Sequence, residues 1–237
     1  MSEFRSMYEG AISAESYRSF YVKTYLRMAL GLALTAIVAF FGFVNLVNGG
    51  FIWTLLSGFG PMVLMLVQLG VAVFFSARLT SMSKTSAMVC FYLYSALTGV
   101  TLSVLPLVFD IATIFMALGF CALLFINLCV IGMTTKIDIS RFSGIMVAGL
   151  MTLCVIGVIS LFVNNALFNN IYNYLGVILF VFITAWDAQN LKRFYVASTA
   201  DTRMITNFSM YAAFGLYLDF INLFLRILSI FGRHNDN

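Results

Sequence analysis

Two aspartates lie within long apolar stretches of the sequence, where ionisable side chains are rare. Asp187 lies in the segment TAWDAQNLK, and Asp219 lies in the segment LYLDFIN. If the two carboxyl groups approach each other away from water, both cannot be ionised cheaply, so they share a proton and titrate as a unit. Carboxylate oxygens are also the hard ligands that Ca²⁺ prefers. The pair therefore predicts a proton-sensitive cation site, with Asp187 and Asp219 as transient calcium ligands.

Three other polar residues could act with this pair. Asn222 lies three residues after Asp219 and shares its helical face, and Arg226 continues that face. Arg78 ends another apolar stretch. We expect Asp187, Asp219, Arg78 and Asn222 to form the pH sensor and the ion pathway. The alternative is purely structural, because each aspartate could pair with Arg78 or with backbone donors and hold the helices together.

Membrane-spanning helices must position these residues. The chain is 62% hydrophobic and only 9% charged, whereas about a quarter of the residues of a soluble domain are charged. Seven apolar stretches are close to the ~20 residues that cross a bilayer as a helix. They cover residues 26–47, 61–77, 87–109, 111–133, 143–163, 171–191 and 207–231, and the apolar run 51–56 could extend the second of them. We expect an all-α membrane protein with a single seven-helix domain over residues 26–231, between a cytoplasmic tail (1–25) and a C-terminal tail (232–237).

The Lys and Arg residues predict the orientation, because short cytoplasmic loops carry most of them. With the N-terminus in the cytoplasm, all of the 13 Lys and Arg residues except Arg226 and Arg233 fall on the cytoplasmic side. The odd number of spans then places the C-terminus, with His234, on the outer side. Counted from the ends of these stretches, Asp219 lies ~13–18 Å deep and Asp187 only ~7 Å deep. A tilt, or a last helix that starts outside the membrane at Thr206-Asn207, would reduce this mismatch.

Other residues point to packing and exclude several kinds of chemistry. Ser95, Gly99 and Ser103 recur every fourth residue, a stripe of small side chains that predicts close helix packing. The four cysteines lie in apolar segments without a CxxC pair, which indicates small buried hydrophobes. The only histidine, His234, lies in the polar tail, so a clustered histidine metal site and a serine–histidine protease are excluded. No basic run interleaved with aromatic residues indicates nucleic-acid binding, and no cofactor is expected.

Three segments resemble the Bax inhibitor-1 family, the transmembrane Bax inhibitor motif proteins. They are YSALTG at residues 94–99, AWDAQNLK at 185–192 and LYLDFINLFL at 216–225, and the resemblance extends over nearly the whole chain. The short N-terminal tail resembles that of a bacterial member, which implies the inner membrane. The resemblance implies a seven-helix bundle whose C-terminal helix is central. It also implies a pH-sensitive calcium leak governed by two aspartates on the sixth and seventh helices, which match Asp187 and Asp219. The basic partner of the family, an arginine at the cytoplasmic end of the second helix, matches Arg78 by position.

Three functions are compatible with these features. The expected one is a proton-gated cation leak, in which ionised Asp187 attracts Arg78 and closes the cytoplasmic mouth. Protonation at lower pH removes this attraction, so the leak is expected to rise. The alternative is a modulator of a membrane protease or of a stress or cell-death pathway, which acts through contacts with another membrane protein. An intramembrane aspartyl protease is disfavoured, because that class needs Gly-x-Gly-Asp around its second aspartate and Tyr217-Leu218 precede Asp219 here. An enzyme is therefore not expected, and the expected partners are the lipid bilayer, calcium ions and protons.

The predicted topology can be tested by accessibility labelling of single introduced cysteines. We expect labelling from the outer side at positions 49 and 166, and from the cytoplasmic side at positions 84, 138 and 198. Labelling of positions 138 and 166 from the same side would rule out the seven-helix topology.

Overall fold

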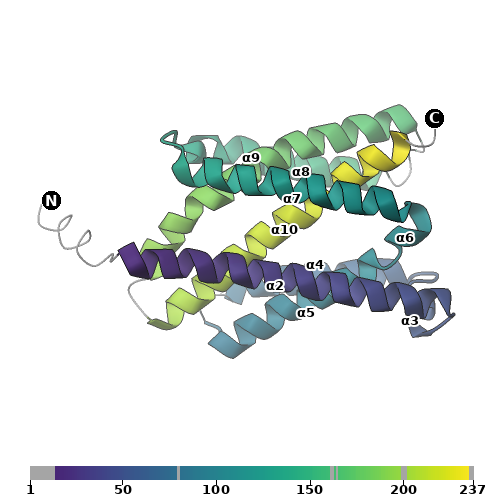
Figure 1. Ribbon diagram of the computed structural model, residues 1–237, viewed down its shortest axis with the longest axis horizontal. Coiled ribbons are helices and arrows are strands. Elements are labelled where there is room, and N and C mark those ends of the chain that lie inside the picture. Colours follow the sequence, from purple (N-terminus) through teal and green to yellow (C-terminus); the bar gives the residue numbers. More distant parts are fainter. Residues whose placement is uncertain (1–13, 79–80, 161–162, 164, 199–201, 235–237) are drawn as a thin grey trace, which may run out of the picture. The chain divides into compact units, whose positions relative to one another are not determined.

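The computed structural model of the protein describes residues 14–78, 81–160, 163, 165–198 and 202–234. These residues are almost entirely helical, and no strand occurs among them (Figure 1). Arg5 and the side chains of Arg203, Arg233 and His234 lie outside the described residues. The helices are α2 (Ala14–Val47), α3 (Phe51–Leu55), α4 (Gly60–Arg78), α5 (Lys84–Leu102), α6 (Leu105–Val108), α7 (Ile111–Thr134), η1 (Ile139–Phe142), α8 (Ser143–Ser160), α9 (Ala166–Ser198) and α10 (Thr202–His234).

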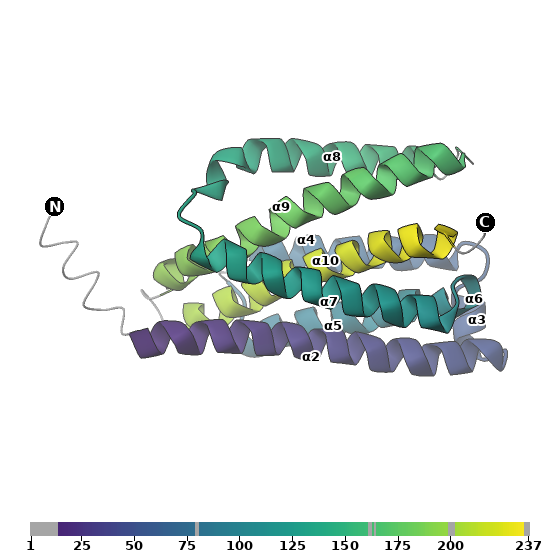
Figure 2. The same ribbon diagram turned by 45° about the horizontal axis from the view of Figure 1, so that its top comes forward.

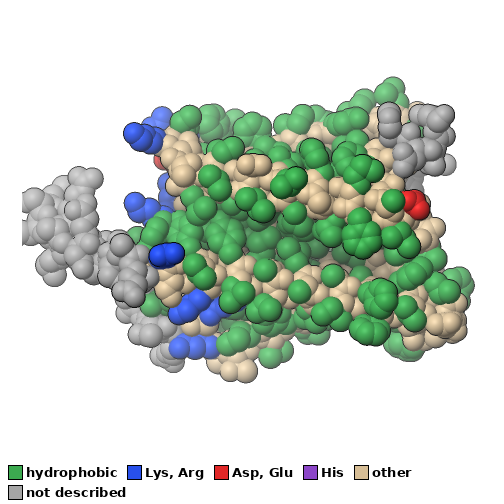
Figure 3. All heavy atoms as spheres, viewed as in Figure 1, with side chains coloured by type: hydrophobic (Ala, Val, Ile, Leu, Met, Phe, Trp, Pro, Cys, Tyr) green, Lys and Arg blue, Asp and Glu red, His purple; other side chains and the backbone are tan. Residues whose placement is uncertain are grey.

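Seven of the helical segments in the described chain are long and apolar enough to cross a membrane. They run over Tyr17–Val47, Gly60–Arg78, Lys84–Val108, Ile111–Thr134, Ile139–Ser160, Ala166–Val196 and Ile205–Gly232. Hydrophobic side chains cover most of the helix sides visible in Figure 3, and the Lys and Arg side chains gather at helix ends. The prediction of an all-α membrane protein with seven spans is confirmed.

Two of the apolar stretches are interrupted by local backbone signals. The third stretch is divided into α5 and α6, because Pro106 lies in the first turn of α6 and has no backbone N–H to continue the α5 hydrogen-bond ladder. The run 51–56 does not extend α4 but forms the separate helix α3. Between α3 and α4, Gly58 adopts a φ of 57°, which is a turn conformation that favours glycine. The tight connection at Phe109-Asp110 begins α7, where the Asp110 carboxylate accepts a hydrogen bond from the Ala112 N–H at 3.0 Å.

Three helices extend well beyond the apolar stretches that predicted them. The first begins at Ala14, the sixth continues to Ser198 and the seventh begins at Thr202. Apolar composition marks only the part of a helix that lies in hydrocarbon, whereas the backbone hydrogen bonds continue into polar surroundings. Hydropathy therefore underestimates the length of these helices.

The described chain divides into two compact units. One unit contains the residues up to Ser103 and the segment Leu191–Phe214, and the other contains Val104–Asn190 and the residues from Gly215 onward. Helices α9 and α10 each contribute one part to each unit. The last span is the most buried, because 56% of its most apolar part lies inside the protein, against 11–28% in the other six spans. This burial agrees with the expectation that the C-terminal helix is central.

In the first unit, small residues allow α2 and α5 to lie side by side (Figures 1 and 2). The Thr35 hydroxyl on α2 donates to the Ser95 carbonyl on α5 at 2.9 Å. A Cβ at Gly99 would lie 2.7 Å from both the Thr35 carbonyl oxygen and the Val38 Cβ. Ser103 lies against Gly42 in the same way, where a Cβ would be 2.8 Å from the Ser103 Cβ. The stripe of Ser95, Gly99 and Ser103 thus faces α2.

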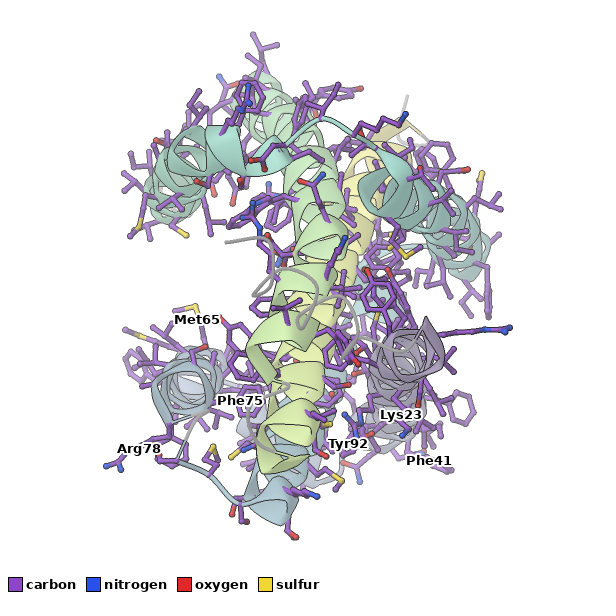
Figure 4. The ribbon with its side chains drawn as sticks, turned by 90° about the vertical axis from the view of Figure 1, so that its left-hand side faces the viewer. Lys23, Phe41, Met65, Phe75, Arg78 and Tyr92 are labelled. Carbon is purple, nitrogen blue, oxygen red and sulfur yellow. The ribbon has the colours of Figure 1, made fainter. Side chains whose placement is uncertain are left out.

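Aromatic side chains hold the first part of α10 within the same unit. The Phe214 ring makes edge contacts with Phe75 of α4 and with Phe91 and Tyr94 of α5, with ring centroids 5.1, 6.1 and 5.0 Å away. Figure 4 shows Phe75 pointing from α4 toward α10, whereas Phe41 of α2 points outward. The rings enclose Phe214, which directly precedes the segment of α10 that belongs to the second unit.

We predict that Gly99→Leu prevents correct folding or lowers the melting temperature strongly. The added side chain would collide with the α2 backbone at Thr35, and overpacking of this kind costs about 3 kcal/mol or more where backbone must move. Gly70→Leu on α4 is the matched control, because a Cβ there meets no atom within 4 Å. Equal yield and melting temperature for the two variants would show that the stripe does not carry the packing of α2 on α5.

Candidate functional site

The carboxyl group of Asp187 lies against the backbone of α10 in the second unit. A Cβ built at Gly215 would be 3.0 Å from Asp187 Oδ2, so the carboxylate occupies the space that a side chain would otherwise fill. Gly215 lies four residues before Asp219 and therefore on the same face of α10. The two aspartates predicted from the sequence are thus brought to one interface between α9 and α10.

Asp219 is the more enclosed of the two side chains, with 4% of its surface exposed. Its Oδ2 atom is buried and has no hydrogen-bond partner in the described part of the chain. Asp187 is half-buried, and likewise takes part in no hydrogen bond or ion pair with the described residues. A buried carboxylate oxygen without a donor is costly unless it carries a proton or binds a cation. The structural alternative, in which Arg78 or backbone donors pair with the aspartates and hold the helices together, stays a prediction.

Close packing of α7 fixes the backbone of α9 next to Asp187. At Gly132 of α7, a Cβ would overlap the Ala185 carbonyl oxygen and would lie 2.9 Å from the Ala188 Cβ. Ala188 is fully buried. Ala185 and Ala188 bracket Asp187 along α9, so α7 packs closely against the turn that carries the carboxyl group.

Gln189 ties the same turn of α9 to the connection between α7 and α8. Its Oε1 accepts from the Ile139 backbone N–H at 2.9 Å, and its Nε2 donates to the Ile137 carbonyl at 2.8 Å. Figure 2 shows this connection, in which η1 leads from α7 into α8. The Gln189 side chain, two residues after Asp187, thus satisfies the Ile137 carbonyl and the Ile139 N–H, which lie just before and at the start of η1.

The other predicted site residues are placed differently. Asn222 donates to the Leu218 carbonyl of its own helix at 2.8 Å. Arg226 contacts Tyr172 of α9. Arg78 is the last residue of α4, is exposed and points outward in Figure 4, and it has no ion pair among the described residues. The predicted pairing of Arg78 with Asp187 therefore stays a prediction.

The extended helices reduce, but do not remove, the mismatch in depth between the two aspartates. Asp187 lies 11 residues before the end of α9 at Ser198 (198 − 187), and Asp219 lies 17 residues after the start of α10 at Thr202 (219 − 202). Asp187 is closer to level with Gly215, which lies 13 residues after that start (215 − 202). The estimate from hydropathy placed Asp187 too close to its helix end, because it ended that helix at residue 191.

The arrangement offers oxygen ligands but no complete metal cage. No group of three or more His, Cys, Asp or Glu side chains lies together among the described residues. Two carboxyl groups alone suit a proton or a cation that passes through and keeps part of its water, since Ca²⁺ takes six to eight oxygen ligands when it is held tightly.

Sequence reasoning missed the residues that support the pair, namely Gly132, Gly215 and Gln189. The glycines could not be distinguished from other glycines in apolar helices, because their role depends on which helix lies opposite. One signal was present, since Gly215 precedes Asp219 by one helical turn.

Known proteins are similar to this chain over nearly its whole length. Residues 17–236 match the family described as "Inhibitor of apoptosis-promoting Bax1". The inner membrane protein YbhL of Escherichia coli is 34% identical over 219 residues, which cover 91% of this chain and 92% of that protein. A protein of Borreliella burgdorferi is 32% identical over 92% of this chain and 93% of its own length. A protein of Rickettsia prowazekii is 30% identical over 94% of this chain and 92% of its own length.

We predict that Gln189→Ala lowers the free energy of unfolding by about 1–3 kcal/mol, because it removes two hydrogen bonds to backbone groups. It should also increase protease cleavage at the connection that contains η1. Asn127→Ala is the matched amide control, since the exposed Asn127 side chain donates only to Leu123 within its own helix. Similar effects of the two variants on stability and cleavage would show that Gln189 does not fasten this connection.

Proposed function

Because this chain belongs to the Bax inhibitor-1 family, we propose that it is a pH-sensitive calcium leak of a bacterial inner membrane, governed by Asp187 and Asp219. The single observation that carries the proposal is the contact of the Asp187 carboxylate with Gly215, one helical turn from the enclosed Asp219. The name of the relative YbhL, an inner membrane protein, supports the location. The orientation with the N-terminus in the cytoplasm belongs to the same proposal.

The carboxyl pair supplies both a cation ligand and a proton-dependent gate. At the α9–α10 interface the Asp187 carboxylate lies against Gly215, one helical turn from Asp219, and the described residues provide no hydrogen bond to the Asp219 Oδ2 atom. One proton shared between them relieves the repulsion of two buried negative charges. When the pair carries less than its full complement of protons, it attracts cations, and the proton and the calcium ion compete for the same oxygens.

The proton also changes how the pair interacts with basic groups. An ionised carboxylate attracts an arginine, and a protonated one does not. Arg78 is the basic partner that the family resemblance assigns. We propose that loss of this attraction at lower pH opens the path, so the leak rises as the pH falls. Arg78→Gln should then leak at high pH as well as at low pH.

The test is calcium flux into liposomes that contain the purified protein, measured between about pH 6 and pH 8. Asp187→Asn and Asp219→Asn should each flatten the pH dependence, because either change leaves a single carboxyl group with no partner to share its proton. The double variant should be no flatter than either single variant. Asp187→Asn should also keep the leak raised at high pH.

The matched control is Asp110→Asn, which removes a carboxylate that only caps α7. Asparagine caps helices as well as aspartate does, so this variant should keep the wild-type pH profile. If Asp187→Asn and Asp219→Asn also keep that profile, the pair is not the sensor. If the wild-type protein carries no calcium at any pH, the leak function fails, and a role as modulator of another membrane protein becomes the better account.

A further inference from the structure

A second charged contact lies at the same α9–α10 interface, and the function above does not use it. The Arg226 guanidinium of α10 occupies the space beside Gly176 of α9, where a Cβ would overlap the Arg226 Cδ, Nε and Cζ atoms. This mirrors the contact of Asp187 with Gly215. Each helix thus contributes one charged side chain and one glycine that makes room for the charged side chain of the other.

The two contacts are in matching register. Asp187 and Gly176 are 11 residues apart on α9 (187 − 176), and Arg226 and Gly215 are 11 residues apart on α10 (226 − 215). Eleven residues make about three turns, so both contacts lie on one face of each helix, ~16 Å apart along the axis. The interface therefore has an acidic end and a basic end. Asp219 lies between them, two turns from Arg226.

Arg226 is held by an aromatic residue and not by an acid. Its Cζ lies 4.4 Å from the centre of the Tyr172 ring. Its guanidinium nitrogens donate to the Tyr172 carbonyl at 3.4 Å and to the Tyr172 hydroxyl at 3.2 Å. No carboxylate among the described residues forms an ion pair with it, and its Nε–H is buried without an acceptor. The full positive charge is thus not neutralised locally.

A purely packing role explains this arrangement poorly. An apolar side chain could fill the space beside Gly176 without the cost of placing a charge within a membrane span. The guanidinium also lies against Tyr172 of α9. Its positive charge therefore stays at the helix interface. A retained charge acts on any ion that passes nearby, and it acts twice as strongly on a divalent ion as on a monovalent one.

We propose that Arg226 is a specificity-determining residue of the leak: its fixed positive charge slows the passage of divalent cations at the end of the α9–α10 interface opposite Asp187. The aspartates attract calcium and Arg226 limits its flow, so the protein conducts as a slow leak. This inference rests on the proposed function, because it concerns the same ion path.

The test compares calcium and potassium flux into liposomes at one fixed pH. Arg226→Gln should raise calcium flux about tenfold and potassium flux about threefold, because the repulsion scales with the charge of the ion. Arg226→Lys keeps the charge and should recover most of the discrimination against calcium. Arg141→Gln removes an exposed arginine of η1 and is the matched control, expected to leave both fluxes at the wild-type level.

Three results would overturn the inference while leaving the proposed function intact. Arg226→Gln could leave both fluxes at the wild-type level, or could raise both by the same factor, which would indicate a steric plug. Arg226→Lys could leak as much as Arg226→Gln, which would make the loss of packing, and not of charge, the cause.

If Arg226→Gln does not fold, Tyr172→Leu frees the guanidinium and should raise the ratio of calcium to potassium flux. An unchanged ratio in that variant would likewise count against Arg226. Absence of calcium flux in the wild-type protein would instead reject the leak itself.

Discussion

The contact of the Asp187 carboxylate with the glycine backbone of α10 is the interaction on which the site depends. Glycine at position 215 lets a charged group approach within van der Waals distance of the helix that carries Asp219. The packing of Gly132 against α9 and the two hydrogen bonds of Gln189 position the same turn. A Cβ at position 215 would lie 3.0 Å from Asp187 Oδ2, so the carboxylate would have to shift to admit a side chain there.

Placing charge inside a bilayer requires compensation, and the second unit provides it in two forms. At one end of the α9–α10 interface, we propose that two carboxyl groups reduce their repulsion by sharing a proton. At the other end, Arg226 is stabilised by the Tyr172 ring and hydroxyl. Neither arrangement neutralises the charges as a buried ion pair would. Both arrangements leave charges that can act on a passing cation. In the proposed leak, the charges that are costly to bury are the ones that control conduction.

The sequence predicted the charged residues of the site, because such residues are rare in membrane spans. It did not predict the glycines that pack against them. Asp187 and Asp219 were identifiable because carboxylates are out of place in apolar helices. The seven spans followed from hydropathy in the same way, although α9 continued past residue 191 to Ser198 because backbone hydrogen bonding does not stop where apolar composition does. Gly132, Gly176 and Gly215 could not be predicted, since a glycine reveals its role only when the opposite helix and its register are known. The partner of Arg226 was hidden for the same reason.

The central claim is that Asp187 and Asp219 share one proton, and infrared difference spectroscopy of the protein in lipid tests it most directly. The band of a protonated carboxyl group should appear over one pH range in the wild-type protein and depend on both residues. In Asp187→Asn, and equally in Asp219→Asn, the remaining group should titrate over a different pH range from the wild-type pair. If each single variant loses only its own part of the band, and the remainder titrates as in the wild-type protein, the two aspartates ionise independently and the account of the gate is contradicted.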